Sequence, residues 1–352
     1  MVEIALDAMG GDHAPREIVR GALRSVEQGW LAREELILVG DEGRIAAELQ
    51  SAGVDPKNFR VQHAPEVIEM GETPLDALRK KRASSIGIAT ELVATGKAAA
   101  VVSAGHTGAA VACAKLRLGT LEGIRRPGIA VSFDSLTGPA VLIDVGANVD
   151  CKPVHLFQYG LMGHAYARDV LGVKEPTVAL LNIGEEEEKG NRLIKETADL
   201  YRSSGLPFVG NAEGQDVFRG KATVLVCDGF VGNLVLKTSE GMGEFLLQAF
   251  ASELQAALTP EKAKEITRRI AQRIDYAEHG GALLLGVEGI VVIGHGRSDA
   301  RAAASMLRTA KRYVSAEVNR HIVASLRATA AAQGGESPGA SSSGDSPVRH
   351  DR

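Results

Sequence analysis

AVLIDVG, residues 140–146, is a run of apolar and β-branched residues with an acid and a glycine near its end. Runs of the same kind, each with glycine or an acid at its end, recur along the chain: IALD (4–7), LILVGD (36–41), AAVVSAG (99–105), TVALLNIG (177–184) and ATVLVCDG (222–229). Amphipathic stretches of helical length separate most of them. Continuous apolar strands that alternate with helices are typical of a mostly parallel sheet covered on both faces. The sequence therefore predicts an α/β fold.

The carboxyl ends of these strands are where we expect the functional site. In open α/β sheets, ligands bind beyond the strand ends, because glycine lets the backbone approach there and helix N-termini offer unpaired N–H groups. The motifs that follow the strands therefore carry most of the functional information.

Composition and charge narrow the class of protein. The chain has 352 residues, of which 45% are hydrophobic, enough for one large or two ordinary domains. A formal net charge of -4 and a pI of about 6.2 offer no overall attraction to nucleic acid, so we expect no nucleic-acid partner. The three cysteines, Cys113, Cys151 and Cys227, are widely separated and predict neither a disulfide framework nor a zinc site. Their pattern fits a reducing cytoplasm.

No stretch of the sequence predicts export or a membrane span. The N-terminal residues lack the charged and apolar regions of a signal peptide. No window reaches the roughly 18 uninterrupted apolar residues that cross a bilayer. Any membrane contact should therefore be peripheral.

Two consecutive helices are predicted at 234–258 and 260–277, joined near Thr259. At about 1.5 Å per residue the first would be roughly 37 Å long, so this hairpin should protrude from the sheet. The first helix has an apolar stripe that includes Leu254 and Leu258, and the second carries Arg268, Arg269 and Arg273. Two interpretations remain: a hairpin packed on itself or on a dimer partner, and a basic, apolar tip that contacts anionic lipid or an acidic protein.

The domain organisation follows from these segments. We expect a single domain over residues 1–330, with the helical hairpin at 234–277 as part of it. Residues 331–352 are rich in Gly, Ser and Pro and poor in large apolar side chains, so we predict a disordered tail.

Two motifs follow strands in the first half of the chain. SAGHTGA (103–109) precedes a helix expected to begin near Thr107, and it suits either an anion or oxyanion cradle or a tight strand-to-helix turn. It matches neither a Walker motif nor a dinucleotide fingerprint. DAMGGDHAP (7–15) contains two acids and a histidine, but the spacing matches no strong metal motif, and Asp12 as a helix cap is the competing explanation. We therefore expect no metal and no cofactor.

Three further motifs follow strands in the second half. DVGANVDCKP (144–153) offers Asp144 and Asn148, and NIGEEEEKGN (182–191) has four glutamates, read as a solvated helix start, before Lys189. Lys189 suits an oxyanion site or an ion pair with a neighbouring glutamate. CDGFVGNLVLK (227–237) opens the long helix, where Asn233 either donates its amide to an oxyanion or caps the helix. No GxSxG elbow and no local Cys/His pair appears, so we expect direct displacement rather than covalent catalysis.

These motifs together resemble one known family. In this order and at these intervals, DAMGGDHAP, SAGHTGA, DVGANVDCKP, LLNIGEEEEKGN, CDGFVGNLVLK and HGGALLLG (279–286) resemble the acyl-carrier-protein:phosphate acyltransferase (PlsX) family, from Ile4 to about Val323. The resemblance implies a Rossmann-like, three-layer α/β/α sandwich akin to isopropylmalate dehydrogenases and phosphate acetyltransferases. It also implies reversible transfer of a long-chain acyl group from acyl carrier protein to inorganic phosphate, giving acyl phosphate for phospholipid synthesis.

The resemblance also implies partners and a location. It implies a homodimer in the cytoplasm, peripherally associated with the inner face of the cell membrane, near the membrane glycerol-3-phosphate acyltransferase that consumes its product. The helical hairpin would supply the carrier or membrane contact, through Leu254, Leu258, Arg268, Arg269 and Arg273. The sequence departs from the family pattern at four positions, namely His106 in place of Asn, Val154 in place of Glu, Gly128 in place of Ala and Arg297 in place of Ser.

For this reaction we expect two catalytic residues and a cradle. Lys189 would hold phosphate and neutralise developing charge, and Asn233 with neighbouring N–H groups would face the oxyanion. The cradle for phosphate and thioester would consist of Gly105, His106, Thr107, Gly108, Asp144, Asn148, Asp228 and Gly232. The alternatives are a non-catalytic scaffold that binds carrier protein or lipid and, with less support, an isopropylmalate-type NAD-dependent dehydrogenase, for which the chain shows neither a dinucleotide fingerprint nor a metal-binding acid cluster.

Overall fold

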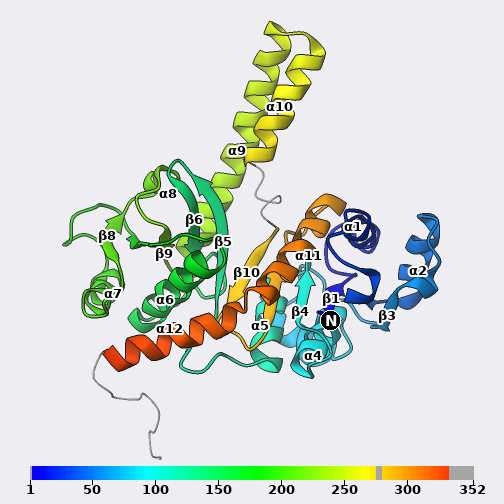
Figure 1. Cartoon of the computed structure of the whole chain (residues 1–352), viewed down its shortest axis with the longest axis horizontal. Helices are drawn as coiled ribbons and strands as arrows, with labels where there is room; N and C mark the ends of the chain where they lie inside the picture. Colours follow the sequence, from blue (N-terminus) through cyan, green and yellow to red (C-terminus); the bar gives the residue numbers. More distant parts are fainter. Residues whose placement is uncertain (1, 275–279, 333–352) are drawn as a thin grey trace, which may run out of the picture.

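The fold is built on one eleven-stranded sheet with helices on both faces (Figure 1). The computed structural model describes residues 2–274 and 280–332. The strands are β1 (Ile4–Asp7), β2 (Leu36–Gly40), β3 (Arg60–His63), β4 (Ala100–Ser103), β5 (Gly128–Ser135), β6 (Gly138–Ile143), β7 (Val178–Leu181), β8 (Phe208–Ala212), β9 (Val224–Val226), β10 (Ala282–Leu285) and β11 (Ile290–Ile293).

Most strands are followed by a helix, as in α/β folds generally. The helices are α1 (Arg16–Glu27), α2 (Glu42–Ser51), α3 (Pro74–Lys80), α4 (Ser85–Ala94), α5 (Thr107–Arg117), α6 (Pro153–Asp169), α7 (Arg192–Arg202), α8 (Asp216–Arg219), α9 (Gly229–Ala257), α10 (Pro260–Ile274), α11 (Ala300–Ser315) and α12 (Val318–Ala332).

The two halves of the sheet run in opposite directions. Its strand order is β3-β2-β1-β4-β11-β10-β5-β6-β9-β7-β8. The pairs β11/β10, β10/β5 and β5/β6 are antiparallel, and every other pair is parallel. As a consequence, β6, β9, β7 and β8 point opposite to β1, β2, β3, β4 and β11.

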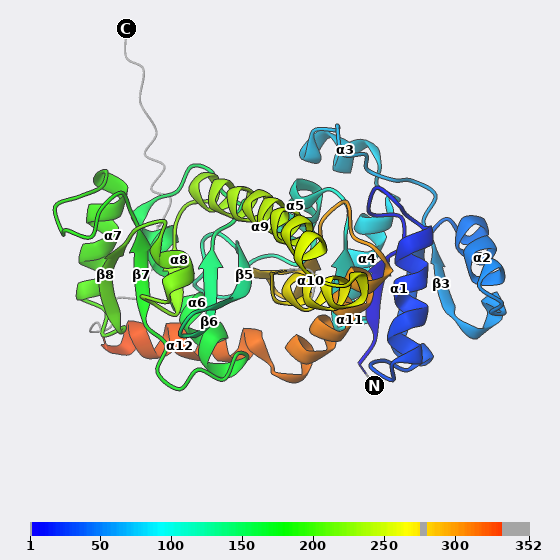
Figure 2. The same cartoon turned by 90° about the horizontal axis from the view of Figure 1, so that it is seen from above.

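Two hydrophobic cores lie on opposite faces of the sheet, because successive side chains of a strand point to opposite faces. Ile4 and Leu6 of β1 belong to the core under α1, α6, α7, α11 and α12, whereas Ala5 belongs to the core under α3, α4, α5 and α8. Figure 2 shows these two helical layers on either side of the strands. The predicted α/β fold with a mostly parallel sheet is confirmed, and it has three layers.

The strands predicted from sequence are those with fully buried, continuous apolar runs. All six runs form strands, β1, β2, β4, β6, β7 and β9, most of them one to three residues shorter at an end than predicted. The other five strands were not predicted. β3 (RVQH) is polar and largely exposed at the sheet edge, and β10 and β11 are four residues each, separated by a short glycine-containing turn.

The helical hairpin projects from the body of the protein (Figure 1). The predicted start of the first helix is residue 234, but α9 begins five residues earlier, at Gly229, because Asp228 caps it. The second helix begins at Pro260, as predicted, and is described to Ile274, so residues 275–277 of the predicted hairpin lie outside the described residues. Within the predicted tail, residues 331 and 332 belong to α12, and 333–352 lie outside the described part of the chain.

Candidate active site

A buried carboxylate organises the loop that follows β6. Asp144 has no exposed surface, and its Oδ1 accepts hydrogen bonds from the backbone N–H groups of Ile129 (3.0 Å), Gly146 (3.1 Å) and Ala147 (2.9 Å). Its Oδ2 accepts from the N–H of Asn148 at 2.8 Å. Burial raises the pKa of Asp144, and these donors oppose that rise. Asp144 therefore shapes the loop and presents no surface to a substrate.

The side chain of Asn148 is committed to the same framework. Its amide Nδ2 donates to the Pro127 carbonyl oxygen (2.7 Å) and to the Tyr159 hydroxyl (2.8 Å), and it lies 3.3 Å from Asp144 Oδ2. The backbone carbonyl oxygen of Asn148 accepts from the N–H of Gly229 at 2.8 Å. Asn148 thus joins the loop after β6 to the start of α9.

The start of α9 is seated tightly on this loop. Asp228 Oδ1 accepts from the N–H groups of Phe230 and Val231, both at 3.0 Å, and so caps the helix. A methyl group on Gly232 would overlap the Asp144 carbonyl oxygen, so only glycine permits this approach. The interpretation of Asn233 as the cap is wrong, because it lies in the second turn.

Asn233 remains available as a donor. Its side chain is exposed and lies beside Gly146, where a Cβ would be 3.9 Å from Asn233 Cβ and Cγ. The N–H groups of Gly229, Phe230, Val231 and Gly232 all have acceptors within the protein. The first turn of α9 therefore offers no free N–H, and the predicted neighbouring N–H donors for an oxyanion are already used.

Lys189 lies in the loop that follows β7, and its ammonium group has no partner among the described residues. Two of the four glutamates before it pair elsewhere, Glu185 with Lys221 at 2.8 Å and Glu187 with Arg202 at 3.6 Å. The prediction that the glutamate run starts the next helix is wrong. Helix α7 begins only at Arg192, with Asn191 as its cap. Of the two interpretations of Lys189, the ion pair with a neighbouring glutamate is not observed among the described residues.

Sequence reasoning missed Asn182, at the end of β7. Its buried Nδ2 finds no hydrogen-bond partner among the described residues, and it lies against Gly190 in the Lys189 loop. Asn182 comes one residue after β7 and lies inside the run TVALLNIG (177–184) that was predicted as a strand, so the prediction treated it as part of the strand. A buried amide without a partner requires an explanation, and a ligand held by this loop would provide one.

The loop after β4 belongs to a second group of strand ends. Its neighbours follow β1 and β11, because these three strands are adjacent and parallel. The buried carboxylate of Asp7 accepts from Ser103 Oγ at 2.7 Å, and Ser103 Oγ accepts from the N–H of Gly105 at 3.1 Å. Burial raises the pKa of Asp7. Asp12 lies beside Gly296 and does not cap α1, so that interpretation is wrong.

Helix α5 begins at Thr107, as predicted, and His106 caps it. Nδ1 of His106 accepts from the N–H of Ala109 at 3.4 Å, and Nε2 lies 3.1 Å from the carbonyl oxygen of Glu72, which can only accept. In this arrangement Nδ1 serves as an acceptor and Nε2 as a donor, the same pair of roles that an asparagine amide can fill. The N–H groups of Thr107 and Gly108 have no acceptor in the described ranges and remain open to an anion.

We predict that His106→Ala lowers the free energy of unfolding by about 1 kcal/mol, through loss of the helix cap. His106→Asn should stay close to the wild-type value, because an amide supplies the same acceptor and donor. Urea unfolding of the three proteins measures the difference. An alanine variant as stable as the wild type would show that the ring does not cap α5.

Helix α9 links the two groups of strand ends. Its first turns belong to the group formed by the loops after β6, β9 and β7, and further along, Glu244 Oε1 lies 3.5 Å from Arg297 Nη2 in the loop after β11. Burial and the nearby Lys237 of α9 lower the pKa of His295 in that same loop. The structure thus brings Asp144, Asn148, Asp228, Gly232 and Asn233 together and assigns Gly105–Gly108 to the other group.

Among residues 2–274 and 280–332, no group of three or more His, Cys, Asp or Glu side chains is placed to hold a metal ion. Over the same ranges, no helix is both long and apolar enough to cross a membrane.

Comparison with known proteins agrees with the resemblance seen in the sequence. The family model described as "Fatty acid synthesis protein" matches residues 2–321. The chain is 49% identical over 317 residues to "Phosphate acyltransferase" from Pelotomaculum thermopropionicum, covering 89% of this chain and 92% of that one. Similarity to a phosphotransacetylase structure from Streptococcus pyogenes (TM-score 0.57, 17% identity, 89% and 94% of the two chains) concerns the fold alone. The same holds for a 4-hydroxythreonine-4-phosphate dehydrogenase from Klebsiella pneumoniae (TM-score 0.51, 15% identity, 92% and 100%).

The resemblance to that acyltransferase family and the similarity of fold to phosphotransacetylases and dehydrogenases are thereby confirmed. The chain belongs to the fatty acid synthesis protein family, the family of the phosphate acyltransferases, and is an acyltransferase.

Proposed function

We propose that this acyltransferase moves a long acyl chain from acyl carrier protein to inorganic phosphate, giving acyl phosphate for phospholipid synthesis. The observation that carries the proposal is the ammonium group of Lys189, which is unpaired among the described residues, in a loop where Glu185 and Glu187 pair with other cations. A free cation beside glycines suits a phosphate ion, and the family supports phosphate as the acceptor.

The reaction is a direct displacement. A phosphate oxygen attacks the thioester carbonyl carbon, and a tetrahedral oxyanion forms. Its collapse breaks the carbon–sulfur bond and releases the carrier thiolate, which takes a proton from solvent. A thiol with a pKa of about 8.5 leaves readily, so orientation and charge placement matter more than a strong general acid.

Three sets of groups have the properties that these steps need. Lys189 holds phosphate and neutralises developing charge, and the exposed amide of Asn233 faces the oxyanion. The open N–H groups of Thr107 and Gly108 at the N-terminus of α5 belong to the other group of strand ends, so this part of the cradle requires that the two groups meet at one phosphate along α9. Asp144, Asn148, Asp228 and Gly232 act by holding the loop and the start of α9 in place.

The proposal also specifies the acyl donor, a long acyl chain carried by acyl carrier protein. Initial rates with short, medium and long acyl chains on carrier protein, and with the same chains on coenzyme A, test it. We expect the highest kcat/KM for long chains on carrier protein. Equal efficiency with the coenzyme A thioesters would refute the carrier requirement.

We also propose a homodimer and a peripheral membrane contact, close to the glycerol-3-phosphate acyltransferase that takes up the product. Support comes from exposed apolar side chains along α9, a feature of interfaces: Phe230, Leu234, Met242, Phe245 and Phe250. Near the tip of the hairpin, Leu254 is half-buried and Leu258 is 37% exposed. The tip therefore has apolar side chains for a membrane surface.

The arginines of α10 lie back from this tip. Arg268 and Arg269 are exposed, and at about 1.5 Å per residue Arg268 is roughly 12 Å from Pro260. Arg273 follows on the same helix. That these three residues contact the carrier remains a prediction.

Replacing Arg268, Arg269 and Arg273 by glutamate tests that prediction and the membrane contact together. We expect weaker sedimentation with vesicles containing anionic lipid, because about 1 kcal/mol of attraction is lost for each basic residue near such a surface. An unchanged KM for the carrier thioester would show that these arginines do not contact the carrier. Unchanged vesicle binding would show that they do not contact the membrane.

A further inference from the structure

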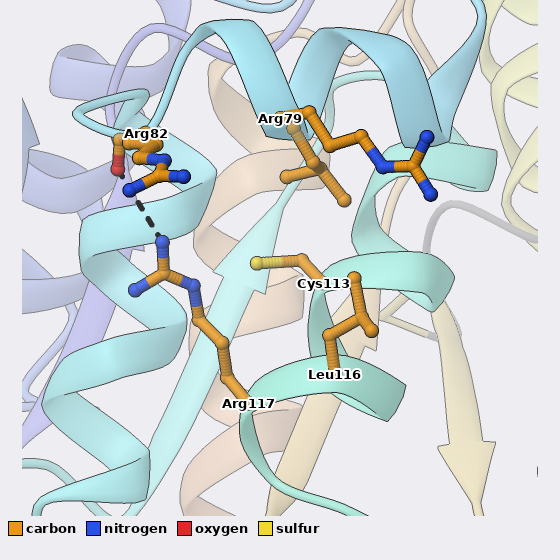
Figure 3. Close-up of a pocket in the computed structure, with 6 residues that line it drawn as sticks. Arg79, Arg82, Cys113, Leu116 and Arg117 are labelled. Carbon is orange, nitrogen blue, oxygen red and sulfur yellow. Dashed lines mark hydrogen bonds between the residues drawn. The ribbon is translucent and has the colours of Figure 1, made fainter.

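A basic pocket lies on the helical layer that contains α5, away from the groups assigned to the reaction. Its volume is about 270 Å³, and it is lined by Leu78, Arg79, Arg82, Cys113, Leu116 and Arg117. Figure 3 shows Arg82 and Arg117 together on one side of Cys113, and Arg79 on the other side with its guanidinium group directed away from them. Three arginines along the rim of one hollow give it affinity for several carboxylates spread over a surface.

Two of the three arginines are free to bind a partner. Arg117 is held by Glu91 Oε2 at 2.7 Å and by the Arg82 carbonyl oxygen at 3.3 Å. Arg79 and Arg82 are exposed, and their guanidinium groups form no ion pair or hydrogen bond within the described residues. Residues 75–82 (LDALRKKR) hold one acidic and four basic residues. In a chain of net charge -4, this segment is a local region of positive potential.

Large apolar side chains stand exposed beside this charge. Leu116 is 67% exposed and Leu75 is 51% exposed, on α5 and α3 respectively. A small anion would leave these leucines in water, whereas a helix with both carboxylates and apolar side chains would cover them. Arginine beside apolar contacts is a common composition for the centre of a protein interface.

The pocket is formed by α3 and α5, and the phosphate cradle lies at the N-terminus of the same helix α5. Pro74, which opens α3, packs against Gly108 at the start of α5, and the Glu72 carbonyl accepts from His106. From Thr107 to Leu116 the distance along α5 is roughly 14 Å at about 1.5 Å per residue. A protein docked at the pocket would therefore hold a flexible acyl-bearing arm close to the cradle.

We propose that this pocket and its two flanking leucines form the docking surface for an acidic helix of the acyl carrier protein. The inference rests on the proposed function and deepens it by placing the carrier on α3 and α5 rather than on the α9/α10 hairpin. Carboxylates of the carrier pair with Arg79 and Arg82, and its apolar side chains cover Leu75 and Leu116. Opposite charges also steer the encounter, so association should weaken as salt is added.

The test reverses the charge of the pocket and matches it with a control. The variant is Arg79→Glu/Arg82→Glu, and the control is Arg44→Glu/Lys57→Glu, two exposed cations around α2 that undergo the same change in net charge. For each protein we would measure KM and kcat with the acyl-carrier thioester, the rate with a short acyl-pantetheine thioester, and direct binding of the carrier by calorimetry. Thermal melting verifies folding, and Arg79→Ala/Arg82→Ala serves if the charge reversal unfolds the protein.

We expect the pocket variant to raise the KM for the carrier thioester about tenfold or more and to weaken carrier binding by a similar factor. Its rate with the short thioester should stay within about twofold of wild type, and the control should behave as wild type. Unchanged KM and binding, or an equal loss with both thioesters, would overturn the proposal. If the wild type binds carrier but forms no acyl phosphate, the proposed function fails, and the binding data alone decide the docking site.

Discussion

Lys189→Ala should lower the rate of acyl-phosphate formation about a hundred- to a thousandfold. Removing one group that stabilises a developing oxyanion typically costs about 2.7–4 kcal/mol in the transition state. The ammonium group has no ion pair among the described residues, so its removal leaves no buried charge behind, and the loss should appear in activity and not in stability. Steady-state kinetics with the carrier thioester at several phosphate concentrations measures it.

Two variants make this result specific. Lys189→Arg keeps the charge but presents a planar guanidinium, so we expect partial activity. Lys195→Ala removes an exposed lysine from the helix that follows the same loop, and it should leave the rate unchanged. Near-normal turnover by Lys189→Ala would remove Lys189 from the reaction.

Asp144→Ala should lower the free energy of unfolding by about 3 kcal/mol or more. The carboxylate accepts hydrogen bonds from four backbone N–H groups, and bonds to a charged group contribute about 1.5–3 kcal/mol each. The N–H of the buried residue Ile129 would lose its hydrogen bond to Asp144 where water has no access, whereas the loop N–H groups can recover part of the loss from water. Urea unfolding gives the change from the shift in midpoint, provided that the slope stays constant.

Asp144→Asn should lose less, because it keeps one acceptor oxygen but turns an NH₂ group toward the donors of Asn148. Asp134→Ala, at an exposed aspartate of β5, is the matched control and should be close to wild type. If Asp144 contacted substrate instead, its variants would fold normally and raise a KM. Wild-type stability of Asp144→Ala would therefore refute the positioning role.

The local sequence pattern was sufficient to predict those strands in which every residue is buried. β1, β2 and β4 have fully buried apolar runs, which only a sheet covered on both faces explains. The reversal of direction at β10 and β5 could not be predicted, because both strands are flanked by pairings between residues far apart in sequence, such as Leu283 with Ala130. The sequence therefore predicted strand ends but not their division into two groups.

For the site, the candidate residues could be predicted from the sequence, but their contacts could not. The motif resemblance selected Lys189 and Asn233, but only the structure shows that Lys221 and Arg202 pair with two of the neighbouring glutamates, Glu185 and Glu187. The cap of α9 was misassigned because Asp228 and Asn233 are both good caps, and the choice between them depends on the tight packing of Gly232 on Asp144. Neither the ion pairs of these glutamates nor the packing of Gly232 on Asp144 can be inferred from the neighbouring residues in the sequence.

The most direct test of acyl transfer to phosphate is to incubate the purified protein with a long-chain acyl-carrier thioester, with and without inorganic phosphate. Free thiol and hydroxylamine-trappable acyl phosphate are followed in the same samples. We predict that both signals appear together and only when phosphate is present. Binding of the thioester without either signal would contradict the account and favour a non-catalytic scaffold for carrier protein or lipid.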